Sequence, residues 1–120
     1  MKVLVLGASS KPERYAYMAA ERLQAAGHDC YLLGARSGQV GPQTLWTEWP
    51  DPETFIPETV TLYMGPEAQK AYHDKLLHSG TKRVIFNPGT ENQAFETLLK
   101  EQGLEVLRAC TLVMLATGTF

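Results

Sequence analysis

The 120-residue sequence predicts an α/β fold in which helices cover both faces of a parallel sheet. Two patterns carry this prediction. Short apolar runs recur along the chain without alternating polar residues, which is typical of strands that are buried on both faces. Segments with helical periodicity separate most of these runs, and a crossover of that length joins parallel rather than antiparallel strands.

The first apolar run, Val3–Leu6, predicts a strand that ends at Gly7. We expect Ser10 to cap a helix over residues 11–26, because Pro12 then falls in the first turn and apolar side chains recur on one face. A strand, a glycine turn and a helix N-terminus in succession form an anion site, since free N–H groups and the positive end of the helix dipole meet there.

A second strand is predicted over residues 31–33, which makes the first unit βαβ. The following segment, residues 35–58, is rich in glycine and proline and holds both tryptophans, Trp46 and Trp49. We expect a long ordered loop. Two interpretations stay open: the loop serves a functional site, or its tryptophans cover a sheet edge where a helix is missing.

The rest of the chain continues the alternation. Residues 60–64 predict a third strand, and a helix begins at Pro66 and runs up to Gly80. Residues 83–86 predict the fourth strand, and the next helix is expected to open on a Thr90–Gln93 capping box. Residues 104–111 predict the fifth strand.

We therefore expect a doubly wound, Rossmann-like parallel sheet of five strands in the order 3-2-1-4-5. The switch point would lie between strands one and four. In such sheets, ligands bind beyond the carboxyl ends of the strands at this point.

Composition restricts the function. The net charge is −2, with 11 basic and 13 acidic residues, so no general attraction to nucleic acid or to anionic membranes is expected. The two cysteines are too few for a disulfide framework, and we find neither a signal peptide nor a membrane span. We expect one soluble, cytoplasmic domain over residues 1–120.

The sequence around the first two strands favours a nucleotide with an extra ribose phosphate. The G-x-G-x-x-G pattern of NAD sites is absent, because only Gly7 stands in the first turn. The second strand ends in Gly34-Ala35-Arg36, and an arginine there suits a phosphate better than a ribose hydroxyl. Coenzyme A (CoA) and NADP both satisfy this condition.

Four stretches resemble the CoA-binding domain family, the small stand-alone group similar to the N-terminal domain of the succinyl-CoA synthetase alpha subunit. They are Gly7-Ala8-Ser9 followed by Pro12-Glu13-Arg14-Tyr15, then Thr59–Tyr63, Val84–Asn92 and Ala109–Met114. The Asn87-Pro88-Gly89-Thr90-Glu91 and Cys110-Thr111-Leu112-Val113 elements within them are the most specific. The resemblance covers nearly the whole chain. It implies a Rossmann-type fold that binds CoA or an acyl-CoA, and it implies no established reaction.

The predicted contacts divide by the part of the ligand that they would meet. Ser9 in the Gly7 turn is expected at the pyrophosphate, Arg36 at the ribose phosphate, and the Asn87-Pro88-Gly89 turn along the pantetheine. The full predicted set of binding residues is Gly7, Ala8, Ser9, Ser10, Lys11, Arg36, Tyr63, Asn87, Pro88, Gly89 and Cys110.

No catalytic constellation is recognisable. The three histidines are scattered and lie at no metal-ligand spacing, and no base is identifiable beside Cys110. We expect no metal and a non-catalytic carrier, sensor or subunit, with a protein partner or a homo-oligomer left open. The alternatives are an NADP-dependent oxidoreductase module and an interaction module that uses the Trp46/Trp49 loop.

Overall fold

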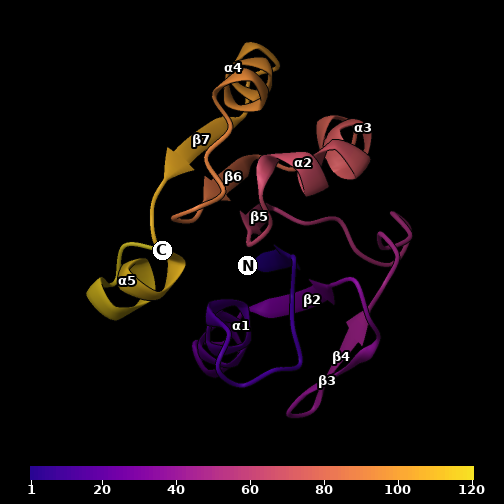
Figure 1. Cartoon of the computed structure of the whole chain (residues 1–120), viewed down its shortest axis with the longest axis vertical. Helices are drawn as coiled ribbons and strands as arrows, with labels where there is room; N and C mark the ends of the chain where they lie inside the picture. Colours follow the sequence, from indigo (N-terminus) through magenta and orange to yellow (C-terminus); the bar gives the residue numbers. More distant parts are fainter.

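The computed structural model describes residues 1–120 and places seven strands in one mostly parallel sheet (Figure 1). The sheet order is β3-β4-β2-β1-β5-β6-β7. The predicted α/β class is confirmed. The strands are β1 (Lys2–Leu6), β2 (Asp29–Leu33), β3 (Gly38–Val40), β4 (Gln43–Trp46), β5 (Thr59–Leu62), β6 (Arg83–Phe86) and β7 (Glu105–Arg108).

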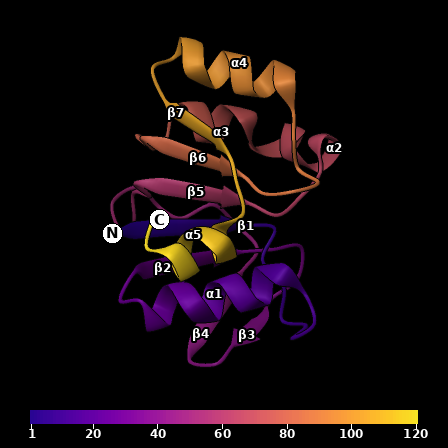
Figure 2. The ribbon, with the colours of Figure 1, turned by 90° about the vertical axis from the view of Figure 1, so that its left-hand side faces the viewer.

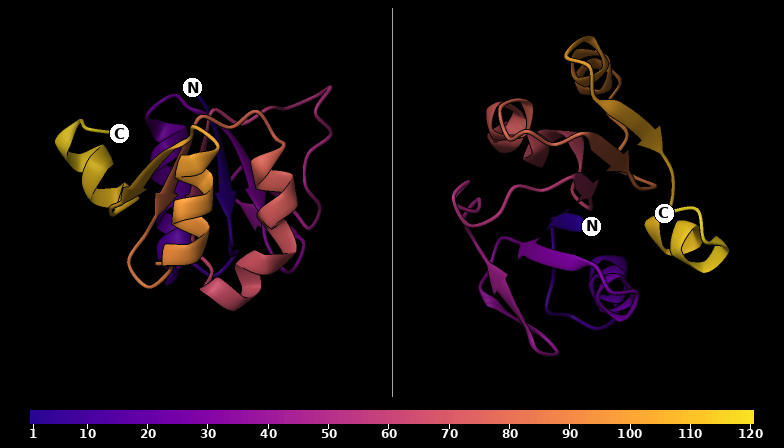
Figure 3. Two further views of the ribbon diagram at one scale, coloured as in Figure 1. Left: turned by 90° about the horizontal axis from the view of Figure 1, so that it is seen from above. Right: turned by 180° about the vertical axis from the view of Figure 1, so that it is seen from behind.

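Helices cover both faces of the sheet. The helix α1 and the C-terminal α5 lie on one face, and α3 and α4 lie on the other (Figures 2 and 3). None of the helices combines the length and the apolar character needed to cross a membrane. The helices are α1 (Tyr15–Ala25), α2 (Pro66–Gln69), the 3-10 turn η1 (Lys70–Tyr72), α3 (His73–Leu77), α4 (Gln93–Glu101) and α5 (Thr111–Thr117).

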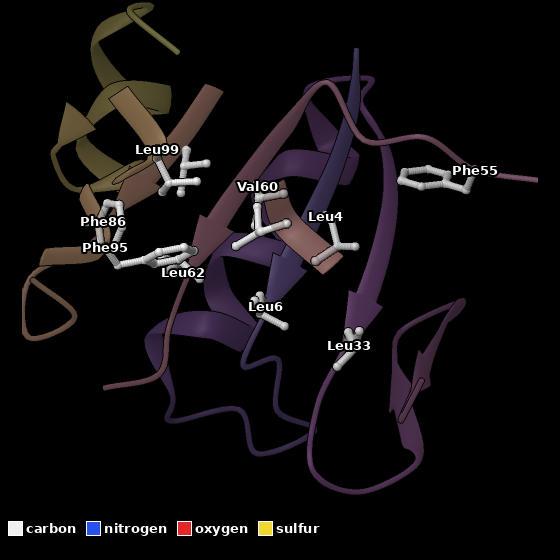
Figure 4. Close-up of a cluster of buried hydrophobic side chains, with 11 residues drawn as sticks. Leu4, Leu6, Leu33, Phe55, Val60, Leu62, Phe86, Phe95 and Leu99 are labelled. Carbon is white, nitrogen blue, oxygen red and sulfur yellow. The ribbon is translucent and has the colours of Figure 1, made fainter. Parts of the chain in front are cut away.

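The central strand β1 supplies both halves of the core. Its Leu4 and Leu6 face a cluster that includes Phe86 and Phe95 (Figure 4), while its other apolar side chains join a second cluster with α1. All four side chains from Val3 to Leu6 are fully buried. This two-sided burial is the reason that the run lacks polar residues.

The predicted strand order is wrong. In the numbering of the five predicted strands, the observed order is 2-1-3-4-5, because β5 pairs with β1. The place beside β2 is taken by β4, whose Leu45 and Trp46 pair in parallel with the end of β2. The switch point therefore lies between β1 and β5, not between the first and fourth predicted strands.

The segment predicted as one long loop contains an antiparallel hairpin. Strands β3 and β4 meet at a two-residue turn of Gly41 and Pro42, where Gly41 has φ +58°. The remainder returns across the sheet face that α3 and α4 cover, and it buries Phe55 there with Trp49 packed alongside. The interpretation of this segment as a cover for the sheet thus holds for Trp49, whereas Trp46 is half exposed.

Two helix starts differ from prediction. Helix α1 begins at Tyr15 rather than at residue 11, and its N-cap is Arg14 instead of Ser10. Residues 11–14 form a turn in which the Arg14 N–H donates to the Lys11 carbonyl at 3.0 Å. A proline disfavours helical backbone at the residue before it, so the start moves beyond Pro12.

The later helices show the same kind of displacement. Helix α4 is capped by Asn92, whose Oδ1 accepts from the Phe95 N–H at 3.3 Å, while Glu96 accepts from the Asn92 N–H at 2.8 Å. This pair replaces the predicted Thr90–Gln93 box. The fifth strand ends at Arg108, and Thr111 opens α5 where a continuing strand was predicted.

Candidate functional site

A cleft of about 540 Å³ lies at the carboxyl ends of the strands, at the switch point between β1 and β5. It is lined by the loops that follow β1, β2, β5 and β6, and by Leu45 of β4. Nine of the eleven predicted residues line it, namely Gly7, Ala8, Ser9, Ser10, Lys11, Arg36, Tyr63, Pro88 and Gly89.

The Gly7 turn is held by the end of β2. The Gly7 and Ala8 N–H groups both donate to the Leu33 carbonyl, each at 2.9 Å, so neither is free for an anion. Gly7 has φ +96°, and a Cβ there would lie 2.8 Å from the carbonyl carbon of Tyr63. The absence of a side chain at Gly7 is therefore required for its packing against the β5 loop.

The free backbone donors begin at Ser9, the residue after Ala8. The N–H groups of Ser9 and Ser10 donate to no acceptor in the chain, and the same holds for Tyr15 and Ala16 at the start of α1. All four residues line the cleft. These donors and the positive end of the α1 dipole together favour an anion at this point.

Three cations surround these donors. Lys11, Arg14 and Arg36 all line the cleft, and none of them forms an ion pair within the chain. No aspartate or glutamate is among the lining residues. A chain with a net charge of −2 thus concentrates unpaired positive charge at this cleft.

The position of Arg36 depends on a close contact between two loops. The Gly34 N–H donates to the Trp46 carbonyl at 2.8 Å, and a Cβ at Gly34 would overlap the Ala8 carbonyl oxygen. The loop after β2 is thereby pressed against the loop after β1. This contact brings Arg36 to the same cleft as Lys11, although the two residues are far apart in sequence.

Asn87 does not line the cleft, contrary to the prediction. It is buried, and its Nδ2 donates to Thr61 Oγ1 at 2.7 Å and to the Leu62 carbonyl at 2.8 Å. Its Oδ1 accepts from the Thr111 N–H at 2.8 Å. Asn87 therefore joins the ends of β5 and β6 to α5 and supports the floor beneath the site.

Cys110 also lies outside the lining, at the N-cap of α5. It neighbours Tyr63, whose buried hydroxyl has no partner at hydrogen-bond distance. Burial raises the pKa of Tyr63 to about 12, against a smaller opposing effect of the nearby Thr111 hydroxyl. Tyr63 stays protonated near neutral pH and is available only as a neutral group.

The loops after β5 and β6 are tied together by Gln69, which the sequence analysis did not single out. Its buried Nε2 donates to the Met64 carbonyl at 2.9 Å and to the Thr90 carbonyl at 2.7 Å. The Gly89 N–H donates to the Glu91 carboxylate at 2.9 Å. The Pro88–Gly89 wall is therefore fixed, and it offers the cleft a surface instead of a free N–H donor.

The sequence analysis also missed Arg14 and Tyr15 as lining residues. Both were assigned to the interior of a helix over residues 11–26, so their exposure at its start was not foreseen. A cation two residues after Pro12 was the available signal. No histidine or cysteine lines the cleft, and no three His, Cys, Asp or Glu side chains anywhere in the chain are placed to hold a metal ion.

Comparison with known proteins gives one family. The family model described as "CoA binding domain" matches residues 1–116. A solved structure described as an uncharacterized protein is 45% identical, with a TM-score of 0.91, and the match covers 99% of this chain and 97% of that one. No curated protein matches.

Two solved structures of more distant proteins share the fold. A hypothetical protein from Pyrococcus horikoshii OT3 is 26% identical with a TM-score of 0.80, over 92% of this chain and 78% of that one. A protein from Thermus thermophilus is 20% identical with a TM-score of 0.82, over 99% of this chain and 90% of that one.

Proposed function

The chain belongs to the CoA-binding domain family, and from that premise we propose that it binds CoA or an acyl-CoA in the cleft between β1 and β5. One observation carries the placement: three unpaired cations and four free N–H groups meet there without any carboxylate. CoA carries a pyrophosphate and a 3′-phosphate, so it needs positive charge at two separate points.

We assign the pyrophosphate to the N–H groups of Ser9 and Ser10 and to the start of α1. Lys11 and Arg14 flank this position, where a cation is tolerated next to the helix dipole because an anion compensates it. Arg36 is assigned to the 3′-phosphate. The Pro88–Gly89 wall is assigned to the uncharged pantetheine arm, since it presents neither charge nor a free donor.

We further propose that the protein acts as a carrier, a sensor or a subunit, and not as an enzyme by itself. The cleft presents no imidazole, thiol or carboxylate for acid–base or nucleophilic chemistry. Burial raises the pKa of Tyr63 to about 12, so this phenol is protonated near neutral pH.

CoA is expected to raise the melting temperature more than NADP or NAD at equal concentration. A ligand that binds only the folded state stabilises it by about 2.7 kcal/mol at a hundredfold excess over its dissociation constant. Thermal melts with the three ligands measure this, and mass spectrometry of ligand released from the purified protein identifies any acyl group. A larger shift with NADP would favour an oxidoreductase module instead.

Arg36→Ala is expected to erase most of the preference for CoA over dephospho-CoA, which lacks the 3′-phosphate. An exposed charge-assisted hydrogen bond of this kind is worth about 1–2 kcal/mol, or roughly 5- to 30-fold in affinity. Calorimetric titration of both ligands into both proteins closes a double-mutant cycle, which cancels general effects of the substitution.

Arg22 provides the matched control. It is an exposed arginine on α1 that does not line the cleft, so Arg22→Ala should leave both affinities unchanged. A coupling of zero for Arg36 would refute its assignment, and Lys11→Ala would then be titrated with the same ligand pair.

A further inference from the structure

A second hollow lies on the other side of β4, away from the proposed CoA site. It measures about 630 Å³, and we call it the tryptophan groove because it contains the only two tryptophans of the chain. Leu45 lines the cleft while the next residue, Trp46, lines the groove, because successive strand side chains point to opposite faces. The groove is lined by Tyr31, Trp46, Thr47, Glu48, Trp49, Pro50, Asp51, Pro52 and Lys75.

The aromatic walls of the groove are fixed in place. The rings of Tyr31 and Trp46 stack with centroids 6.2 Å apart and planes 15° apart, and Trp49 packs on Tyr72 at 6.3 Å. The Tyr31 hydroxyl donates to the Glu48 carbonyl at 2.8 Å. In Figure 1 this segment projects from the sheet between β4 and β5. A partner would therefore meet a surface that loses little conformational entropy on binding.

The two indole N–H groups of the groove are free. Trp46 is 50% exposed, and neither indole N–H donates to an acceptor in the chain. The Asp51 carboxylate already accepts from the Glu53 N–H at 2.9 Å. Flat aromatic faces beside free indole donors suit a polyproline II helix. Its proline rings pack on aromatic rings, and its backbone carbonyls accept no hydrogen bond within their own chain, so they are free to accept from an indole N–H. Pro50 and Pro52 complete the apolar lining.

The charge of the groove indicates which residue the partner segment carries in addition to its prolines. Glu48 and Asp51 contribute two carboxylates against the single ammonium of Lys75, and none of the three forms an ion pair. A cation on the partner would complement this excess. We infer that the tryptophan groove binds an extended, proline-rich segment of another protein that carries an arginine or a lysine.

Intrinsic fluorescence tests this directly, because both tryptophans lie in the groove. Three short synthetic peptides are titrated: a proline-rich peptide with arginines, the same peptide with glutamates in place of the arginines, and the arginine peptide with alanines in place of the prolines. The first should shift the emission to shorter wavelength and saturate. The second should bind at least fivefold more weakly, and the third should not saturate up to about 1 mM.

Three variants separate the contributions, with calorimetry as a readout independent of the fluorophore. Trp46→Ala should lower the affinity for the first peptide at least tenfold. Glu48→Lys should lower this affinity severalfold, whereas Lys75→Glu should raise it. Val113→Ala, which removes an exposed apolar side chain on α5, should change nothing. None of these variants should alter the CoA-induced melting shift, so failure here and failure of the proposed CoA site are distinguishable.

Three results would overturn the inference. If the alanine peptide bound as tightly as the proline-rich arginine peptide, the interaction would depend on charge alone. Full competition by tetramethylammonium chloride would indicate a cage for a quaternary ammonium ion. If no peptide reached saturation, the groove would not be a peptide site, and the tryptophans would serve only to cover the sheet.

Discussion

Gly7→Ala is expected to lower the free energy of unfolding by about 3–5 kcal/mol. Two costs add. The backbone at Gly7 has φ +96°, which L side chains rarely adopt, and this costs about 1–3 kcal/mol. The new Cβ would also lie 2.8 Å from the Tyr63 carbonyl carbon and 2.9 Å from its oxygen, which forces β1 and β5 apart at their ends. Urea denaturation measures the loss as a lower midpoint at constant slope.

Gly103→Ala is the matched control for this substitution. Gly103 has φ +87°, but nothing lies within 4 Å of its ideal Cβ position, so it carries the conformational cost without the clash. It should lose about 1–2 kcal/mol. Equal losses at the two glycines would show that the approach of Gly7 to the β5 loop does not constrain the fold.

Asn87→Ala is expected to cost about 3–5 kcal/mol of stability, although the residue does not line the cleft. The substitution removes three hydrogen bonds of 2.7–2.8 Å and leaves the Thr111 N–H and the Leu62 carbonyl without their side-chain partner. Each buried group left unsatisfied costs about 1–3 kcal/mol. Thermal and urea denaturation measure the loss, and saturating CoA should still raise the melting temperature of the folded variant.

Asn92→Ala provides a comparison at a second asparagine in the same region. Asn92 caps α4 through a 3.3 Å bond and donates to Gln69 at 3.0 Å, and it is only partly buried. The expected loss is about 1 kcal/mol. If Asn87→Ala cost no more than Asn92→Ala, water would be replacing the buried bonds of Asn87, and its role as the support of the floor would be refuted.

The β1 run and its glycine stop show what local sequence determines. A strand buried on both faces is predominantly apolar, so the runs in Val3–Leu6 and Arg83–Phe86 were located from the local sequence alone. The hairpin was missed because its strands, Gly38–Val40 and Gln43–Trp46, contain no continuous apolar run and lie in a segment rich in glycine and proline. Helix starts shifted because several residues near each start are able to cap it, as Asn92 and Thr90 illustrate.

For the site, too, the sequence predicted some features and missed others. Sequence and family resemblance identified most of the residues around the cleft, since loops at the carboxyl ends of parallel strands converge whatever the strand order. They misplaced Asn87, because a turn sequence does not reveal whether its amide faces a ligand or three internal partners. They also missed Arg14, whose exposure depends on where α1 begins.

By itself, the sequence determined the α/β class, the main parallel strands and the likeness to a CoA-binding family, because these depend on periodicity and on local motifs. Only the tertiary structure decided that β5 lies beside β1, since pairing is a long-range choice between surfaces of similar composition. The same pairing brings the Tyr63 backbone against Gly7. The contact of Gly34 with Ala8 then brings Arg36 and Lys11, 25 positions apart in the numbering, to one cleft.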